Sequence, residues 1–235
     1  MDKTVPPGAA LLLDFIGDIE APKGYDTIYG NNQGKLKKPV TQMTISEIID
    51  AQGGWSKAYG SSATGRYQFM KATLVGLLNE LSLSRTQVFD GNLQDRLGYH
   101  LLKRRGYEKF MAGQIGHIDF GRRLAQEWAS LPVLAATQGG ERRVTRGQSY
   151  YAGDGLNKSL VSPERVERAL EAARIAKPPK SADNGPSPSA PVEQYAEIAY
   201  SSPAPSPTRH DGKFEAPASE PWWSRVVSKL LGREP

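Results

Sequence analysis

Glu20 and Asp26 are two carboxylates six residues apart in the stretch "DFIGDIEAPKGYDTIYG", residues 14–30. Glu20 ends an apolar helical run and is followed by an Ala-Pro-Lys-Gly loop, so we expect it in the last turn of a helix. The helix dipole places partial negative charge there, and apolar neighbours such as Ile19 exclude water. Both effects raise the pKa of a carboxyl group, as a general acid at neutral pH requires. The alternative is a solvated surface charge.

The stretch "SSATGRYQFM", residues 61–70, carries side chains that suit a sugar ligand. Small residues such as Ser62 and Gly65 let the backbone approach a ligand closely. Tyr67 offers a flat aromatic face, and Gln68 offers an amide that both donates and accepts hydrogen bonds. The alternative interpretation is a loop that leads into a helix, with Tyr67 packed in the core.

A third stretch, "RGQSYYAGDGLNK" at residues 146–158, repeats the combination of amide and aromatic side chains. Gln148 and Tyr150 are the candidate ligand-binding residues, with Tyr150 preferred over Tyr151. The "GDG" within it lacks the acidic positions of a calcium-binding loop and predicts a turn. The histidines are scattered without ligand spacing, so we expect neither a metal site nor a cofactor; they are His100, His117 and His210.

The composition limits the classes of partner and chemistry. Lys and Arg outnumber Asp and Glu by 30 to 25, and the sequence pI is about 9.3. This balance suits an anionic partner such as nucleic acid, a lipid surface or a cell-wall polymer. The basic residues are dispersed and form no nucleic-acid recognition motif, so nucleic acid is not expected. The absence of cysteine excludes thiolate zinc sites and cysteine nucleophiles.

The chain changes composition near Ala176. Six of its 17 prolines lie before that residue and eleven at 178 or later, in Pro/Ser-rich sequence with few large apolar side chains. We therefore predict a folded domain at 1–176, a disordered linker at 177–221 and a short basic amphipathic helix at 222–235. The final helix places Arg225, Lys229 and Arg233 on one face and Trp223 at its edge. Contact with an anionic membrane and docking to a protein partner both fit it.

Within residues 1–176 the apolar periodicity is mostly helical. "TISEIIDAQ" carries a capping box with Thr44 and Glu47, and Ser162-Pro163 begins a last helix. Strand candidates are short, near "YDTIYG" and "PVTQM". The predicted fold class is mostly α, with little strand structure. Helices are expected within residues 12–20, 44–52, 67–81, 92–106, 117–132 and 162–177.

Several motifs in the same order resemble phage endolysins of the lambda type, glycoside hydrolase family 104 of the lysozyme-like superfamily. They are "IEAPKGYDTIYG", "SSATGRYQFM", "QDRLGYHLLKRRG", "EWASLP" and "GQSYY", and the resemblance covers residues 8–175. It implies an α+β lysozyme-like domain, mostly α, with a small β-hairpin region beside an active-site cleft. It also implies that Glu20 is the catalytic acid, with Asp26 at the "YD" position and Gln68 in "GRYQ". The sequence departs from this pattern in a shorter loop between Glu20 and Tyr25 and a longer segment between Pro132 and Gln148.

The resemblance implies cleavage of the β-1,4 bond between N-acetylmuramic acid and N-acetylglucosamine in peptidoglycan. A lytic transglycosylase with Glu20 alone is favoured. A hydrolytic muramidase that uses Asp26, a chitin-cleaving enzyme and a non-catalytic wall-binding module are the alternatives. The predicted partner is the peptidoglycan glycan strand, and the protein is expected to be a monomer. No signal peptide is recognised at the start of the sequence, so delivery to the wall is expected to depend on a holin, a virion or a secretion apparatus.

Overall fold

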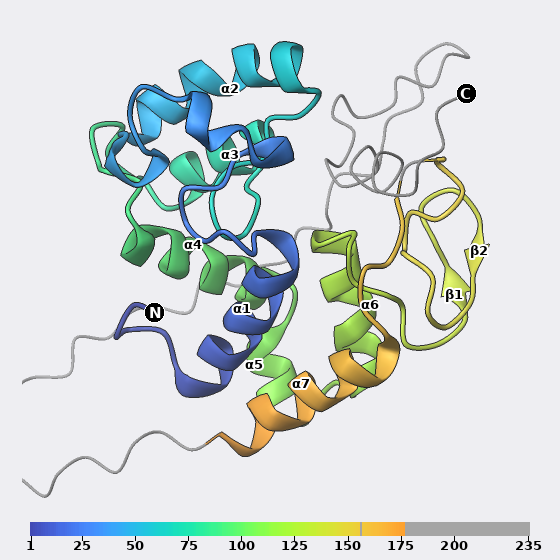
Figure 1. Cartoon of the computed structure of the whole chain (residues 1–235). Helices are drawn as coiled ribbons and strands as arrows, with labels where there is room; N and C mark the ends of the chain where they lie inside the picture. Colours follow the sequence, from blue (N-terminus) through green and yellow to red (C-terminus); the bar gives the residue numbers. More distant parts are fainter. Residues whose placement is uncertain (156, 177–235) are drawn as a thin grey trace, which may run out of the picture. The chain divides into compact units, whose positions relative to one another are not determined.

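The computed structural model of the protein describes residues 1–155 and 157–176, which form a mostly helical fold (Figure 1). The α-helices are α1 Pro7–Glu20, α2 Ile45–Tyr59, α3 Lys71–Glu80, α4 Gly91–Arg104, α5 Tyr107–Met111, α6 His117–Glu127 and α7 Pro163–Ile175. Between them lie the 3-10 helices η1 Tyr29–Lys35 and η2 Val40–Gln42, and the antiparallel strands β1 Thr137–Gln138 and β2 Arg143–Val144. The predicted fold class is confirmed. The predicted linker and terminal amphipathic helix lie outside the described residues.

The helices begin where the sequence supplies capping residues. Thr44 accepts a hydrogen bond from the Glu47 N–H, and the Glu47 carboxylate accepts one from the Thr44 N–H, which confirms the predicted capping box of α2. Asp90 caps α4 by accepting from the Leu93 N–H. Pro163 occupies the first turn of α7, where a missing N–H costs nothing.

Two helices are shorter than the periodicity predicts. α3 begins at Lys71 rather than at residue 67, because Gln68 has a φ of 50° and cannot be helical. α6 ends at Glu127 rather than near Pro132, because Trp128 is extended and its indole N–H donates to the Tyr67 carbonyl. Local backbone conformation limits α3, and a tertiary hydrogen bond overrides the apolar pattern at the end of α6. The five-residue α5 is a helix that the periodicity did not predict.

The predicted strands near "YDTIYG" and "PVTQM" are wrong. Ile28 forms only an isolated bridge with Thr64, and Val40–Gln42 is a 3-10 helix. The paired strands are β1 and β2, joined through Gly139 and Gly140. A side chain at Gly139 would lie 2.4 Å from the Tyr150 carbonyl oxygen, so this turn needs glycine because another segment of backbone lies against it.

Within the described residues the seven α-helices enclose one apolar core. α1 packs along α7 and also against α4, while α2 packs on α3 and α6 on α7 (Figure 1). Buried members include Leu13 and Ile16 of α1, Leu101 of α4 and Leu170 of α7. α1 is therefore held on two sides, and its C-terminal residue, Glu20, is fixed with respect to the core.

A buried carboxylate ties the start of the chain to the loop after α1. Asp95 of α4, 1% exposed, accepts hydrogen bonds from the hydroxyls of Tyr25 and Tyr67 and from the Asp2 N–H. The two tyrosine hydroxyls bind Asp95 Oδ1, and the Asp2 N–H binds Oδ2. The α-ammonium group of Met1 lies 3.6 Å from the same Oδ2. Burial and the bond to Asp95 raise the pKa of Tyr25 to about 12. Four donors on three segments thus converge on one side chain.

We predict that Asp95→Asn lowers the free energy of unfolding by about 1–3 kcal/mol, because the new amide N–H group would face the donors of Asp2 and Met1. Urea denaturation measures the loss. Asp50→Asn is the control, since Asp50 is an exposed carboxylate of α2 and its replacement should change stability little. Equal effects of the two substitutions would contradict the role of Asp95.

Candidate active site

Glu20 is buried at the C-terminal end of α1. It is 3% exposed, and the Ser130 hydroxyl donates a hydrogen bond to its Oε1. The helix ends here because Ala21 leaves helical geometry, with its N–H still bonded to the Gly17 carbonyl. A carboxyl group out of contact with water is penalised in its ionised form, and the helix terminus adds to that penalty. The predicted helix-end position of Glu20 is confirmed.

Ser130 is held in a turn that follows α6. Its carbonyl accepts from the Leu160 N–H, and the N–H of Val133 donates to the Gln148 carbonyl. The Ser149 hydroxyl donates to the Ala129 carbonyl, which joins the same two segments a second time. These bonds place the "WASLP" and "GQSYY" motifs side by side and bring the first of them to Glu20.

The loop at residues 61–70 is held by two buried glutamines. Gln52 of α2 donates to the carbonyls of Ser62 and Phe69. Gln94 of α4 accepts from the Arg66 N–H and donates to the carbonyls of Tyr25 and Phe89. Gly65 has a φ of 79°, and a side chain there would collide with Gln94. Irregular backbone is satisfied here by side-chain amides rather than by a sheet.

Arg66 fastens this loop to α1 one turn before Glu20. Its guanidinium lies 3.3 Å from the Asp14 carboxylate and 3.0 Å from that of Asp18. Gly17 allows the approach, since a Cβ there would lie 2.4 Å from the Arg66 Nε. The loop that carries Tyr67 and Gln68 is therefore placed against the helix that carries Glu20.

Ser62 and Tyr67 are both buried within this loop. The Ser62 hydroxyl accepts from the Lys71 N–H, at the start of α3. The Tyr67 ring is 1% exposed, packs edge-on against Phe69 and donates its hydroxyl to Asp95 at 2.6 Å. Burial and the bond to Asp95 raise the pKa of Tyr67 well above its usual range. Tyr67 is therefore packed in the core, as the alternative interpretation of the sequence expected, and its ring has no exposed face.

Gln68 combines a strained backbone with an unpaired acceptor. Its φ of 50° is rare for a residue other than glycine. The side chain is 7% exposed and donates to the Gly65 carbonyl, while its Oε1 is buried without a hydrogen-bond partner among the described residues. Strain and an unsatisfied polar atom in one residue are typical of ligand-binding positions.

Asp26 is a loop-holding residue in this structure. Its Oδ1 accepts a hydrogen bond of 2.8 Å from the N–H of Thr41, fifteen residues further on. The next residues pair with the 61–70 loop, because the Gly65 N–H donates to the Thr27 carbonyl and Ile28 bridges Thr64. Asp26 therefore supports the connection between α1 and that loop.

The segment at residues 148–151 presents its side chains in different ways. The Gln148 amide oxygen accepts from the Thr145 N–H and so closes its own turn. Tyr151 donates its hydroxyl to the Gln126 carbonyl at 2.7 Å. Tyr150 is half-buried with its ring against Tyr151, and the described residues give its hydroxyl no hydrogen-bond partner. Of the two tyrosines, Tyr150 is the one whose hydroxyl is not already used.

Ser130 is the residue at this site that the sequence patterns did not identify. The "WASLP" motif containing it was recognised only as part of an ordered set, and a serine between apolar residues carries no signal of its own. What reveals it is its contact with Glu20 across the fold.

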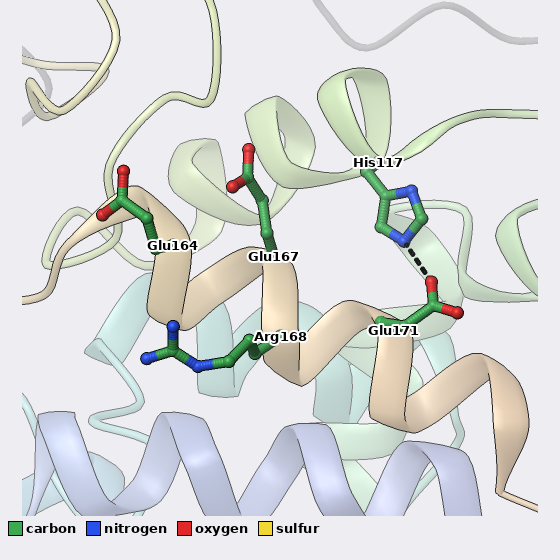
Figure 2. A pocket seen from close by; sticks show the side chains of 5 residues that line it. All are labelled: His117, Glu164, Glu167, Arg168 and Glu171. Carbon is green, nitrogen blue, oxygen red and sulfur yellow. Dashed lines mark ion pairs between the residues drawn. The ribbon is translucent and has the colours of Figure 1, made fainter.

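A separate pocket of 470 Å³ lies between α6 and α7 and holds none of the predicted site residues. Figure 2 shows its lining, with His117 on α6 facing Glu171 on α7 at 3.3 Å. Two other lining carboxylates, Glu164 and Glu167, pair with Arg146, which is not part of the lining. Each lining carboxylate and the imidazole therefore has a partner. The lining residues are His117, Glu164, Glu167, Arg168 and Glu171.

Comparison with known proteins gives one family, described as Endolysin, which matches residues 19–156. The chain belongs to the endolysin family. The match begins at the last turn of α1, includes Glu20 and the three loops described above, and ends before α7. No curated protein and no solved structure matches the chain significantly.

Membership of the endolysin family implies that the substrate is peptidoglycan and that the protein lyses cell wall. Within the part of the chain that the structure describes, no helix is long and apolar enough to cross a membrane.

We predict that Tyr151→Phe lowers the free energy of unfolding by about 1 kcal/mol, because the Gln126 carbonyl loses its donor. Tyr150→Phe should change stability little, since no described residue depends on its hydroxyl. Urea denaturation of the two variants measures the difference. A larger loss for Tyr150→Phe would show that its hydroxyl has a structural task.

Proposed function

We propose that this endolysin cleaves the β-1,4 bond between N-acetylmuramic acid and N-acetylglucosamine as a lytic transglycosylase of the lambda type, with Glu20 as its catalytic acid. The observation that carries the proposal is the buried carboxyl group at the end of α1, inside the region matched to the family. Burial favours the protonated form, which is the form that can give a proton to a leaving group.

The proposed reaction needs one carboxyl group. Glu20 gives its proton to the glycosidic oxygen while the bond from that oxygen to the muramic acid C1 breaks and an oxocarbenium-like centre develops. The 6-hydroxyl of the same muramic acid then attacks C1, and the Glu20 carboxylate takes the hydroxyl proton. The products are a free N-acetylglucosamine hydroxyl and a 1,6-anhydro ring, and Glu20 is protonated again.

The hydrogen bond of Asp26 supports this route over hydrolysis. A muramidase commonly uses a second carboxylate to activate water or stabilise the cation. Here Asp26 Oδ1 accepts from the Thr41 N–H, which suits a residue that holds a loop. Hydrolysis by a muramidase with Asp26 as the second carboxylate is the alternative function.

We assign the direct sugar contacts to Gln68 and Tyr150. The buried Gln68 Oε1 can accept from an acetamido N–H or a hydroxyl, and Tyr150 offers a half-exposed ring and an unused hydroxyl. Ser62, Tyr67 and Gln148 act indirectly, since their polar groups are already bonded to the Lys71 N–H, the Asp95 carboxylate and the Thr145 N–H respectively. No cofactor takes part in this reaction scheme.

We further propose that the protein is made in the cytoplasm and acts on the wall as a monomer after release by a holin, a virion or a secretion apparatus. Reaction on the wall polymer requires only the groups named above.

We predict that Glu20→Gln lowers the rate of lysis of purified peptidoglycan roughly 10²- to 10⁴-fold, because the amide keeps the shape but cannot give a proton. Turbidity loss measures lysis, and circular dichroism checks the fold. Glu108→Gln on the exposed face of α5 is the matched control and should lyse at the wild-type rate. Full activity of Glu20→Gln would rule out the assignment.

The products separate transglycosylation from hydrolysis. Mass spectrometry of the muropeptides released by the wild-type protein should find 1,6-anhydro ends, which are lighter by one water than hydrolytic products. Reducing muramic acid ends alone would establish the muramidase instead.

We predict that Asp26→Asn keeps most of the lytic activity. The asparagine Oδ1 can still accept from the Thr41 N–H, so the loop is retained while the negative charge is lost. A rate within about tenfold of wild type is expected, whereas the loss of a required general base would cost 10²-fold or more. A loss as large as that of Glu20→Gln would favour hydrolysis through Asp26.

A further inference from the structure

We propose that Ser130 is the positioning residue for the catalytic acid, an inference that rests on the function proposed for Glu20. Ser130 is completely buried, and its hydroxyl donates to Glu20 Oε1. It does not act on the substrate. It fixes the orientation of the carboxyl group and sets the pH range in which that group carries its proton.

The position of Ser130 is determined by bonds that do not involve Glu20. Its carbonyl accepts from the Leu160 N–H, and its neighbour Ala129 accepts from the Ser149 hydroxyl. Trp128, two residues earlier, is fixed by its indole bond to the Tyr67 carbonyl. The hydroxyl is therefore supplied by a turn that three bonds hold in place independently of Glu20.

A serine hydroxyl suits an acid that must lose and regain a proton. It donates one hydrogen bond and can also accept, so it stays bonded to either form of the carboxyl group. Donation to the carboxylate stabilises the ionised form and opposes the effect of burial. Loss of the hydroxyl should therefore raise the pKa of Glu20.

Several charged side chains of α1 and of the segments packed against it have partners among the described residues. Arg66 of the 61–70 loop pairs with Asp14 and Asp18. Arg165 of α7 lies over the Phe15 ring, and Asp26 accepts from the Thr41 N–H. Removal of the Ser130 hydroxyl therefore changes the surroundings of Glu20 without removing a charge.

The first experiment follows the carboxyl carbon of Glu20 by NMR across a pH titration, with the signal assigned by its loss in Glu20→Gln. Ser130→Ala should move the titration midpoint upward by roughly one pH unit, as loss of a hydrogen bond to a charged group predicts. Tyr107→Phe is the control, because it removes the hydroxyl of a buried side chain that lies beside Gly8, at the opposite end of α1 from Glu20. An unchanged midpoint in Ser130→Ala overturns the proposal.

The second experiment measures peptidoglycan lysis over the same pH range. Because the acid must be protonated, the alkaline limb of the rate profile should move upward by the same amount in Ser130→Ala, with the maximal rate lowered about tenfold to a hundredfold and KM unchanged. Tyr107→Phe should keep the wild-type limb even where its thermal stability is lower. A limb that moves equally in both variants indicates a general loss of packing and overturns the role of Ser130.

The two measurements separate this inference from the proposed function. A shifted NMR midpoint in a protein without lytic activity would reject Glu20 as the catalytic acid, and with it a catalytic role for Ser130. If lysis requires Glu20 but Ser130→Ala leaves its pH profile unchanged, the proposed function stands and only this inference is rejected.

Discussion

The arrangement around the site depends on one constraint, that a buried carboxyl group must have a hydrogen-bond partner. Glu20 meets it with a hydroxyl that lies 110 residues further along the chain. A buried polar group that is hydrogen-bonded avoids a cost in free energy, so this bond favours the approach of the turn after α6 to the end of α1. The bonds from that turn to residues 147–149 and to Tyr67 then order the other two loops.

Buried polar side chains supply the hydrogen-bond partners that a larger sheet supplies to backbone groups in other folds. The loops around Glu20 contain little regular structure, so their N–H and carbonyl groups need other partners. Gln52 and Gln94 supply them to the 61–70 loop, and Asp95 gathers Tyr25 and Tyr67. Each of these side chains extends from a helix that is itself fixed in the core. The loops are therefore held by rigid elements, which a site that binds and turns over a polymer requires.

The sequence predicted local features better than it predicted the ends of elements. Thr44 and Glu47 formed the expected capping box because both partners lie within one helical turn. Trp128 left the predicted helix, because a bond to Tyr67 outweighed the continuing apolar pattern. The sequence also did not distinguish the environments of Tyr67 and Gln68, although these residues are adjacent in one motif. The Tyr67 ring is buried in the core, whereas the Gln68 Oε1 has no hydrogen-bond partner among the described residues.

The sequence by itself determined the helical class, the change of composition near Ala176 and the position of Glu20 at a helix end, since these follow from periodicity, composition and capping within short stretches. Only the tertiary structure decided that Glu20 is buried against Ser130, that Asp26 is bonded to a loop and that Tyr150 rather than Tyr151 keeps an unused hydroxyl. The physical reason is that burial and hydrogen-bond pairing are properties of side chains that meet from distant segments, and no local pattern records which segments will meet.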